Sequence, residues 1–301
     1  MGWEENVVGG IGDPRLYRLD PDNLLSNGSF EEAIGAEWFG AGYSRVLASA
    51  NAFTAPRGDY VLKVEDDSGA AWERAARSVD YGSALGNKSF LVYVVVRGAT
   101  DHDIDIKLGS STTSGGSINA ASTLTVPVFS DYCRIIHLIK TFSSATDQFV
   151  RVELGGSGST VSETGTAYFD DLRIYEILET YNLDQPNEWK HNWEQIKAAE
   201  YELADRTEKK IVQGWRYSLG LTYTAATAED VQNFIELTES GKVFVVPHID
   251  NLFGSFMVWD GSFEPQYFMG KYLGHTITLP LTSTEIVREK PREIATDYTI
   301  V

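Results

Sequence analysis

The sequence has a single cysteine, Cys133, among 301 residues. One thiol cannot form an intrachain disulfide or build a cysteine-based metal site. Cys133 lies in DYCRIIHLIK, between apolar residues, so we expect a buried structural thiol rather than a nucleophile. No apolar run reaches the roughly 18 residues of a membrane-spanning helix. The opening residues lack the basic and apolar regions of a secretory signal, so we expect a soluble protein made without a classical leader.

Basic residues are scarce: 25 Lys and Arg stand against 43 Asp and Glu, giving a net charge of −18. A surface this acidic repels phosphate backbones and anionic lipids, so neither nucleic acid nor a membrane is an expected partner. Its carboxylates are suitable oxygen ligands for a hard cation such as Ca²⁺. The alternative is that the charge only keeps the surface solvated.

The motifs of common catalytic sites are missing. The sequence contains no GxSxG elbow, P-loop, dinucleotide fingerprint or HExxH motif, and its five histidines are scattered. Neighbouring carboxylates occur at Glu31–Glu32, Asp66–Asp67 and Asp170–Asp171. Adjacent residues of a strand point to opposite faces, so one such pair alone cannot flank a glycosidic bond as a glycosidase requires, although carboxylates from different pairs could. We therefore expect no enzymatic activity.

The first half of the chain carries the pattern of a β-protein. Residues 1–20 are expected to form an extended arm. From residue 21 to residue 178, short β-type runs alternate with Ser-, Thr- and Gly-rich turns, and DIDIKLG places Ile104, Ile106 and Leu108 at every second position. Many short strands without a helical period predict a β-sandwich or jelly roll.

The second half, residues 179–289, is predicted to be a smaller α+β domain with one helix, so the fold class is mainly β. Alternation from Trp215 to Tyr223 predicts a half-buried strand, and the segment from Thr227 to Gly241 has the pattern of a helix. KVFVVPHI and HTITLPL are expected to be strands. Segment 188–204 suits a helix by composition, but we favour a hairpin. Residues 290–301 are expected to form a charged tail.

Four aromatic residues of the first half lie in or near loop-like segments: Trp38, Tyr43, Trp72 and Tyr81. Carbohydrate-binding proteins stack such rings on the apolar faces of sugars. The same residue types are also common in protein cores. These four are the candidate sugar-binding residues.

The first half resembles the jelly rolls of carbohydrate-binding modules. NLLSNGSFEEAIGAEWFG (23–40) is similar to the entry strand of that family, GDYVLKVE (58–65) to the next strand and AYFDDLRIYEI (167–177) to the closing strand. The resemblance implies a structural Ca²⁺ that joins the first and last strands. Its ligands would be Glu31 and Asp171, with Asp170 or Glu32 as alternates. The alternative is that these acids are merely exposed.

The second half is similar to small domains of bacteriophage tail and baseplate proteins, on the strength of three segments: GWRYSLGLTY, AEDVQNFIELTESGKVFVVP and FMVWDGSFEPQYFMGKYLGHTITLPL. That resemblance implies a non-enzymatic structural protein of the virion, in the tail or tail tip, made in the host cytoplasm. Its expected partners are other virion subunits in a symmetric homo-oligomer and a host cell-surface glycan. The alternative is a free carbohydrate-binding protein or an accessory module of a glycan-degrading system.

Overall fold

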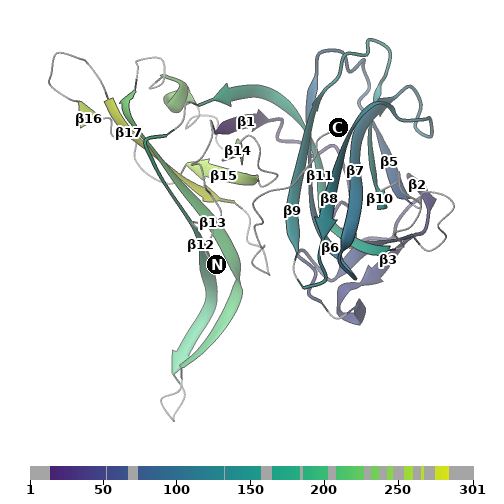
Figure 1. The fold of residues 1–301 in the computed structure, drawn as a ribbon, viewed down its shortest axis with the longest axis horizontal. Coiled ribbons are helices and arrows are strands. Elements are labelled where there is room, and N and C mark those ends of the chain that lie inside the picture. The colour runs from purple at the N-terminus through teal and green to yellow at the C-terminus, as the bar shows by residue number, and fades with distance from the viewer. Residues whose placement is uncertain are drawn as a thin grey trace. The chain divides into compact units, whose positions relative to one another are not determined.

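A computed structural model describes residues 14–51, 53–66, 74–131, 133–156, 165–183, 186–202, 208–226, 232–236, 243–246, 254–259, 266–267 and 275–284. The chain divides into two compact units. Among the described residues, the sandwich unit comprises those within 20–177, and the second unit comprises those within 14–19 and 178–284. Strands dominate both units, which confirms the predicted mainly β fold (Figure 1).

Two antiparallel sheets of five strands form the sandwich unit. The first sheet has the order β2 (Trp38–Ala41), β5 (Arg74–Asp80), β10 (Phe149–Gly156), β7 (His102–Ser111) and β8 (Asn119–Val128). The second has the order β3 (Tyr43–Leu47), β4 (Tyr60–Asp66), β11 (Gly165–Asn182), β6 (Ser89–Gly98) and β9 (Arg134–Thr141). A short 3₁₀ helix, Ala48–Asn51, follows β3.

The core of the sandwich unit lies between these sheets and follows from alternation along the strands. In β7, Ile104, Ile106 and Leu108 are at most 1% exposed. They pair in register with residues of β10, where Leu154 faces Ile106 and Val152 faces Leu108. Alternate residues of an extended strand point to one side, so these apolar side chains fill one layer and the residues between them face outward.

The entry segment meets the closing strand, as the sandwich prediction requires. The backbone N–H of Leu24 donates to the carbonyl of Ile174 (2.9 Å), and that of Leu172 donates to the carbonyl of Gly28 (2.9 Å). Asn23 Oδ1 accepts the N–H of Ile174 at 2.9 Å. The segment itself is irregular rather than the predicted strand, because Asn27 and Phe30 both take positive φ angles.

An antiparallel sheet also forms the second unit, in the order β12 (Glu188–Glu202), β13 (Glu208–Ala226), β17 (His275–Ser283), β15 (Ser255–Trp259), β14 (Val243–Val246) and β1 (Arg15–Leu19). The short strand β16 (Gln266–Tyr267) pairs with β17. Residues 232–236 are helical within the predicted helix, and Phe234 packs 5.3 Å from Tyr223 between ring centroids.

The structure decides two expectations for this unit, the hairpin at residues 188–204 and the N-terminal arm. Residues 188–202 form strand β12 and pair antiparallel with β13, as favoured, so the helical alternative is wrong for them. Residues 15–19 are not part of a free arm: they form β1 and pair with β14, because Leu16 and Tyr17 supply apolar side chains that are at most 5% exposed. The predicted tail 290–301 lies outside the described residues. No helix within the described ranges is long and apolar enough to cross a membrane.

Candidate functional site on the outward face of the five-stranded sheet

Trp38 does not lie where a sugar-stacking residue must be. It is 3% exposed, and its ring packs 5.5 Å from that of Phe30. Arg77, its register partner on β5, lies over the indole at 5.9 Å. The structure therefore corrects this candidate: Trp38 belongs to the sandwich core, because β2 turns its side chain inward.

The other aromatic candidates are not brought together with it. Tyr43, on β3 of the opposite sheet, donates its hydroxyl hydrogen bond to the carbonyl of Trp38 at 2.9 Å. Tyr81 packs edge-on against Phe90, and its hydroxyl contacts Glu176 and Lys88. Burial and the Glu176 carboxylate raise the pKa of Tyr81. Trp72 lies outside the described residues. The three described candidates thus form no common platform.

A different set of polar residues shares one surface: the outward face of the sheet β2–β5–β10–β7–β8. The pairing register places them on the side opposite the apolar core residues. We call this surface the polar face. It is formed by Phe39, Arg74, Ser78, Asp105, Lys107, Thr123, Thr125, Arg151 and Glu153.

Glu153 is the centre of the polar face and joins two arginines. Arg151 contacts its Oε1 through Nε (2.8 Å) and Nη2 (2.6 Å), and Arg74 Nη1 lies 3.0 Å from its Oε2. The guanidinium of Arg151 also lies over Phe39, 4.5 Å from the ring centroid, and donates to the carbonyl of Gly116. The side chains of Arg151 and Glu153 are both 3% exposed, whereas that of Arg74 is 39% exposed. A fixed, buried ion pair thus holds one accessible guanidinium.

A second charged pair continues the polar face onto β7 and β8. Thr125 donates its hydroxyl to Asp105 Oδ1 at 2.6 Å, and Lys107 Nζ lies 3.9 Å from Asp105 Oδ2. Thr123 is the register partner of Lys107 and is half-buried. On β7 and β8, hydrogen-bond donors (Lys107 and Thr125) therefore lie next to an acceptor (Asp105).

Two buried oxygens of this face lack a hydrogen-bond donor or acceptor in the described part of the chain. They are Glu153 Oε2, whose contact with Arg74 lacks hydrogen-bond geometry, and Ser78 Oγ. Buried polar atoms in folded proteins nearly always have partners, since leaving one unpaired costs about 1–3 kcal/mol.

Sequence reasoning missed these residues although their signal was present. In FVRVEL, Arg151 and Glu153 alternate with Val150, Val152 and Leu154. When two paired strands both carry charged residues on their outward side, a polar surface is expected there. The pairing of β10 with both β5 and β7 could not be read from the chain.

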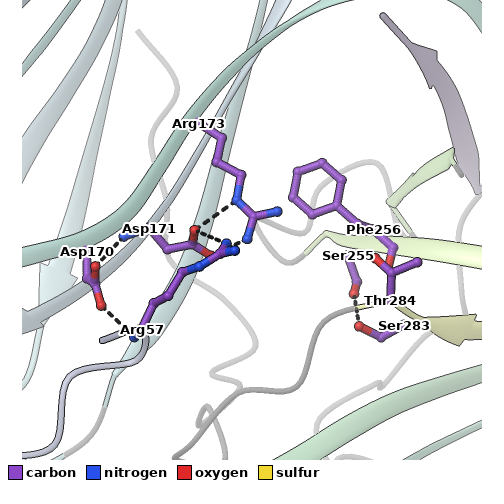
Figure 2. A network of polar contacts seen from close by, with 8 residues as sticks. All are labelled: Arg57, Asp170, Asp171, Arg173, Ser255, Phe256, Ser283 and Thr284. Atoms are coloured by element: carbon purple, nitrogen blue, oxygen red, sulfur yellow. Dashed lines mark hydrogen bonds and ion pairs between the residues drawn. The ribbon is translucent and has the colours of Figure 1, made fainter. Parts of the chain in front are cut away.

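The four carboxylates expected near the entry segment have different surroundings, and Figure 2 shows two of them, Asp170 and Asp171. Asp171 lies in a β-bulge of β11 with φ +50, and arginines occupy its carboxylate. Arg173 contacts it at 2.8 Å and 2.7 Å, and Arg57 Nη1 at 3.0 Å. A carboxylate held by two cations is a poor metal ligand, so Asp171 does not suit the leading role that the resemblance gives it.

Asp170 and Glu31 have no such cation among their described contacts. Asp170 is 1% exposed and accepts only backbone N–H groups, from Arg57 and Asp171, both at 2.7 Å. Glu31 Oε1 accepts those of Asp59 and Tyr60, both at 2.9 Å. Burial raises the pKa of Asp170 to about 8, and the negative charges of Asp171 and Glu31 add to this effect.

The pair Glu31 and Asp170 therefore fits a hard cation better than Glu31 and Asp171. Both are oxygen ligands with lone pairs left over, from opposite ends of the sandwich sequence. The side chain of Glu32 is exposed, and only its backbone is engaged, with Asn27. Within the described residues no three His, Cys, Asp or Glu side chains gather as a metal-binding group, so backbone carbonyls or water would have to complete the coordination.

No protein-family model and no curated protein matches the chain. Among solved structures, it is similar to a family 61 carbohydrate-binding module in complex with β-1,4-galactotriose, at 15% identity and a TM-score of 0.36, covering 51% of this chain and 97% of that one. It is also similar to the CBM22-1 xylan-binding domain of Paenibacillus barcinonensis Xyn10C, at 15% identity and a TM-score of 0.38, covering 56% of this chain and 98% of that one. A third similar structure is the enzymatically active domain of tailspike protein 4 of bacteriophage CBA120, at 13% identity and a TM-score of 0.38, covering 52% of this chain and 21% of that one. These distant likenesses concern about half of the chain.

Proposed function

We propose that the sandwich unit binds carbohydrate through the polar face, and that the chain is a non-enzymatic structural protein of a bacteriophage tail or tail tip. The observation that carries glycan binding is the Arg74–Glu153–Arg151 bridge, in which a buried ion pair fixes an exposed guanidinium. Ligand sites place a few oriented polar groups on a rigid support, since a group already held in place loses little freedom on binding.

The chemistry of the polar face suits sugar hydroxyls. Arg74 offers several N–H donors in a planar fork, and Glu153 holds this guanidinium in place. Hydrogen bonds to charged groups are about twice as strong as neutral ones. Phe39 is half-buried and adds aromatic surface beside them.

The carboxylates of this face support binding rather than hydrolysis. A glycosidase needs one carboxylic acid as proton donor and a second carboxylate as base or nucleophile. Glu153 is bridged by two arginines, and Asp105 is engaged by Thr125 and Lys107. Both carboxylates are thus committed to fixing other side chains.

The virion role rests on the resemblance of segments 214–223, 228–247 and 256–281 to phage tail and baseplate domains. Those segments contribute β13, β14, β15 and β17 of one continuous antiparallel sheet in the second unit. A rigid β domain joined to a glycan-binding sandwich suits a particle that must attach to a cell surface. The alternative, a free carbohydrate-binding protein or accessory module, predicts glycan binding without co-purification with phage particles.

The glycan proposal is tested by a glycan array with the full chain, followed by calorimetric titration of the best polysaccharide. Arg74→Ala and Phe39→Ala should each weaken binding by about tenfold, as expected when an interaction worth about 1–2 kcal/mol is removed. Lys63→Ala, on β4 of the other sheet, should leave affinity unchanged. The proposal would be overturned if no glycan binds. It would also be overturned if Arg74→Ala and Phe39→Ala bind the glycan as tightly as Lys63→Ala does.

We also propose that one structural Ca²⁺ is held by Glu31 and Asp170. The support is that two carboxylates from opposite ends of the sandwich sequence receive only backbone N–H donors in the described structure. A bound ion would join the entry segment to β11 and stabilise the unit, without taking part in sugar chemistry.

A further inference from the structure

The Arg74–Glu153–Arg151 bridge contains two cations and one anion. Arg151 makes two contacts with Glu153 Oε1, at 2.8 Å and 2.6 Å, and both of these side chains are 3% exposed. Arg74 contacts the other oxygen, Oε2, through Nη1 alone at 3.0 Å, and its side chain is 39% exposed. The buried Arg151–Glu153 pair is neutral by itself, so the positive charge of Arg74 is left over at the accessible end of the bridge.

The described residues beside Arg74 on the polar face do not offset this charge. Its register partners are Ala41 on β2 and Gly155 on β10, and neither has a charged side chain. The next residue across the sheet is Asp105 on β7, which Gly155 also faces. Asp105 has Lys107 as its own cationic partner, so this pair adds no net charge to the face.

Two further acids continue the outward sides of these strands at a greater distance. Asp80 lies six residues from Arg74 along β5, about 20 Å away, and its carboxylate accepts the N–H of Gly82 at 2.8 Å. Asp103 lies two residues beyond Asp105 on β7, two strands from β5, which places its Cα about 12 Å from that of Arg74. Exposed charges at these distances are largely screened, because the Debye length is about 8 Å at physiological ionic strength. A local positive charge thus remains at Arg74 in a chain whose net charge is −18.

The remaining edge of the Arg74 guanidinium matches a carboxylate in geometry. Glu153 engages Nη1, whereas Nε and Nη2 have no partner in the described part of the chain. These two nitrogens lie on one edge of a planar group and donate in parallel, which is the arrangement that binds both oxygens of a carboxylate. A sugar hydroxyl carries no charge and uses only part of this edge.

We propose that the sugar bound at the polar face is acidic, and that the carboxylate of a uronic acid pairs with Nε and Nη2 of Arg74. This inference rests on the proposed glycan binding and specifies the class of the ligand. The contact between Arg74 and Glu153 holds the guanidinium in advance, so little freedom is lost when the carboxylate binds. Repulsion by the acidic chain grows with each further charge of the ligand, so short oligosaccharides are the suitable probes.

Calorimetric titration of the full chain with matched pairs of short oligosaccharides tests the proposal. Each pair consists of a uronic acid oligosaccharide, such as an oligogalacturonide, and its carboxyl-reduced form, which keeps the linkages but is neutral. Where a pair binds, the acidic member should bind about tenfold more tightly than the reduced member. If the reduced members bind as tightly as the acidic ones, the inference fails while glycan binding stands. If no oligosaccharide and no glycan of the array binds, both fail.

Three variants assign the preference to Arg74. Arg74→Gln removes the charge but keeps a donor, and should bring the affinities of the acidic and reduced members to within about twofold of each other. Arg74→Lys keeps the charge without the planar edge and should retain a smaller preference than the wild type. Lys63→Gln, on β4 of the other sheet, removes one positive charge elsewhere and should keep the full preference. A preference that survives Arg74→Gln, or that Lys63→Gln reduces equally, would overturn the proposal, and urea unfolding checks that each variant is folded.

Discussion

Arg173 holds Asp171 in a two-point contact on the same strand: Nε lies 2.8 Å from Oδ1, and Nη2 lies 2.7 Å from Oδ2. The two side chains are only 6% and 12% exposed. The β-bulge between Asp170 and Arg173 gives Asp171 its positive φ and separates it from Asp170, which faces other partners. The two adjacent carboxylates thus have different partners: Asp171 is paired with arginine, and Asp170 accepts backbone N–H groups.

Removing Arg173 should leave the buried Asp171 carboxylate with only the half-exposed Arg57 as a cationic partner. Arg173→Met is expected to lower the free energy of unfolding by about 3 kcal/mol, as for other buried pairs broken from one side. Equilibrium urea unfolding measures the change. In the double variant Asp171→Asn/Arg173→Met the loss should be clearly smaller than the sum of the two single losses. Additive losses would show that the contact contributes little.

The sandwich could be predicted because its information is local. Alternation in DIDIKLG placed Ile104, Ile106 and Leu108 on one face, and the structure buries all three. The hairpin was favoured for segment 188–204, and residues 188–202 pair with β13. The outward neighbours of such core positions depend on which strands pair, and β10 lies between β5 and β7, far from both in sequence. The polar face was therefore missed.

The resemblance implied Glu31 and Asp171 as calcium ligands, whereas the contacts of Asp171 lead us to propose Glu31 and Asp170 instead. Sequence alone does not show that a β-bulge turns Asp171 toward Arg57 and Arg173. It also does not show that Trp38 lies inside the sandwich, since a Trp near a turn suits a platform and a core equally well. Both facts depend on contacts between residues distant in the chain.

Calcium should raise the melting temperature of the wild type, because a ligand that binds only the folded state stabilises it, by about 2.7 kcal/mol at 100 times its dissociation constant. Glu31→Gln and Asp170→Asn should abolish the difference between calcium and chelator. Differential scanning fluorimetry measures it.

The neighbouring acids provide the controls for that experiment. Glu32→Gln and Asp171→Asn should keep the calcium response, even though Asp171→Asn lowers stability in both conditions. A response lost in Asp171→Asn but kept in Asp170→Asn would assign the ion to the pair that the family resemblance implied. A wild type indifferent to calcium would remove the proposed ion altogether.

Gly28 is required by the close approach of the entry segment to β11. A Cβ at this position would lie 1.8 Å from the carbonyl oxygen of Leu172, which itself belongs to the backbone and cannot easily move. Gly28→Ala should therefore cost about 3 kcal/mol or more, the upper range for overpacking. Gly115→Ala, where a Cβ meets nothing within 4 Å, should change stability little. Thermal unfolding of both variants gives the comparison.

Alkaline pH should weaken the contact between the loop after β5 and the closing strand. Lys88 Nζ lies 2.6 Å from Glu176 Oε1 and 2.8 Å from the Tyr81 hydroxyl. The Glu176 carboxylate and the Tyr81 hydroxyl raise the pKa of Lys88 above its usual value, and burial and Glu176 raise the pKa of Tyr81. Both groups are held in their protonated forms by folding, so their stabilisation is complete below pH of about 10 and is lost as pH rises through the folded-state pKa values.

The loss should be modest, up to about 1 kcal/mol, because Lys88 is 32% exposed and solvent weakens the pair. Urea unfolding at neutral pH and above pH of about 11 measures it, with Glu176→Gln as the matched variant. This substitution keeps the shape of the side chain and removes the charge that raises both pKa values, so the variant should be less stable at neutral pH and should lose less on going to alkaline pH. If wild type and variant lose stability equally, other lysines and tyrosines account for the alkaline effect and the cluster does not.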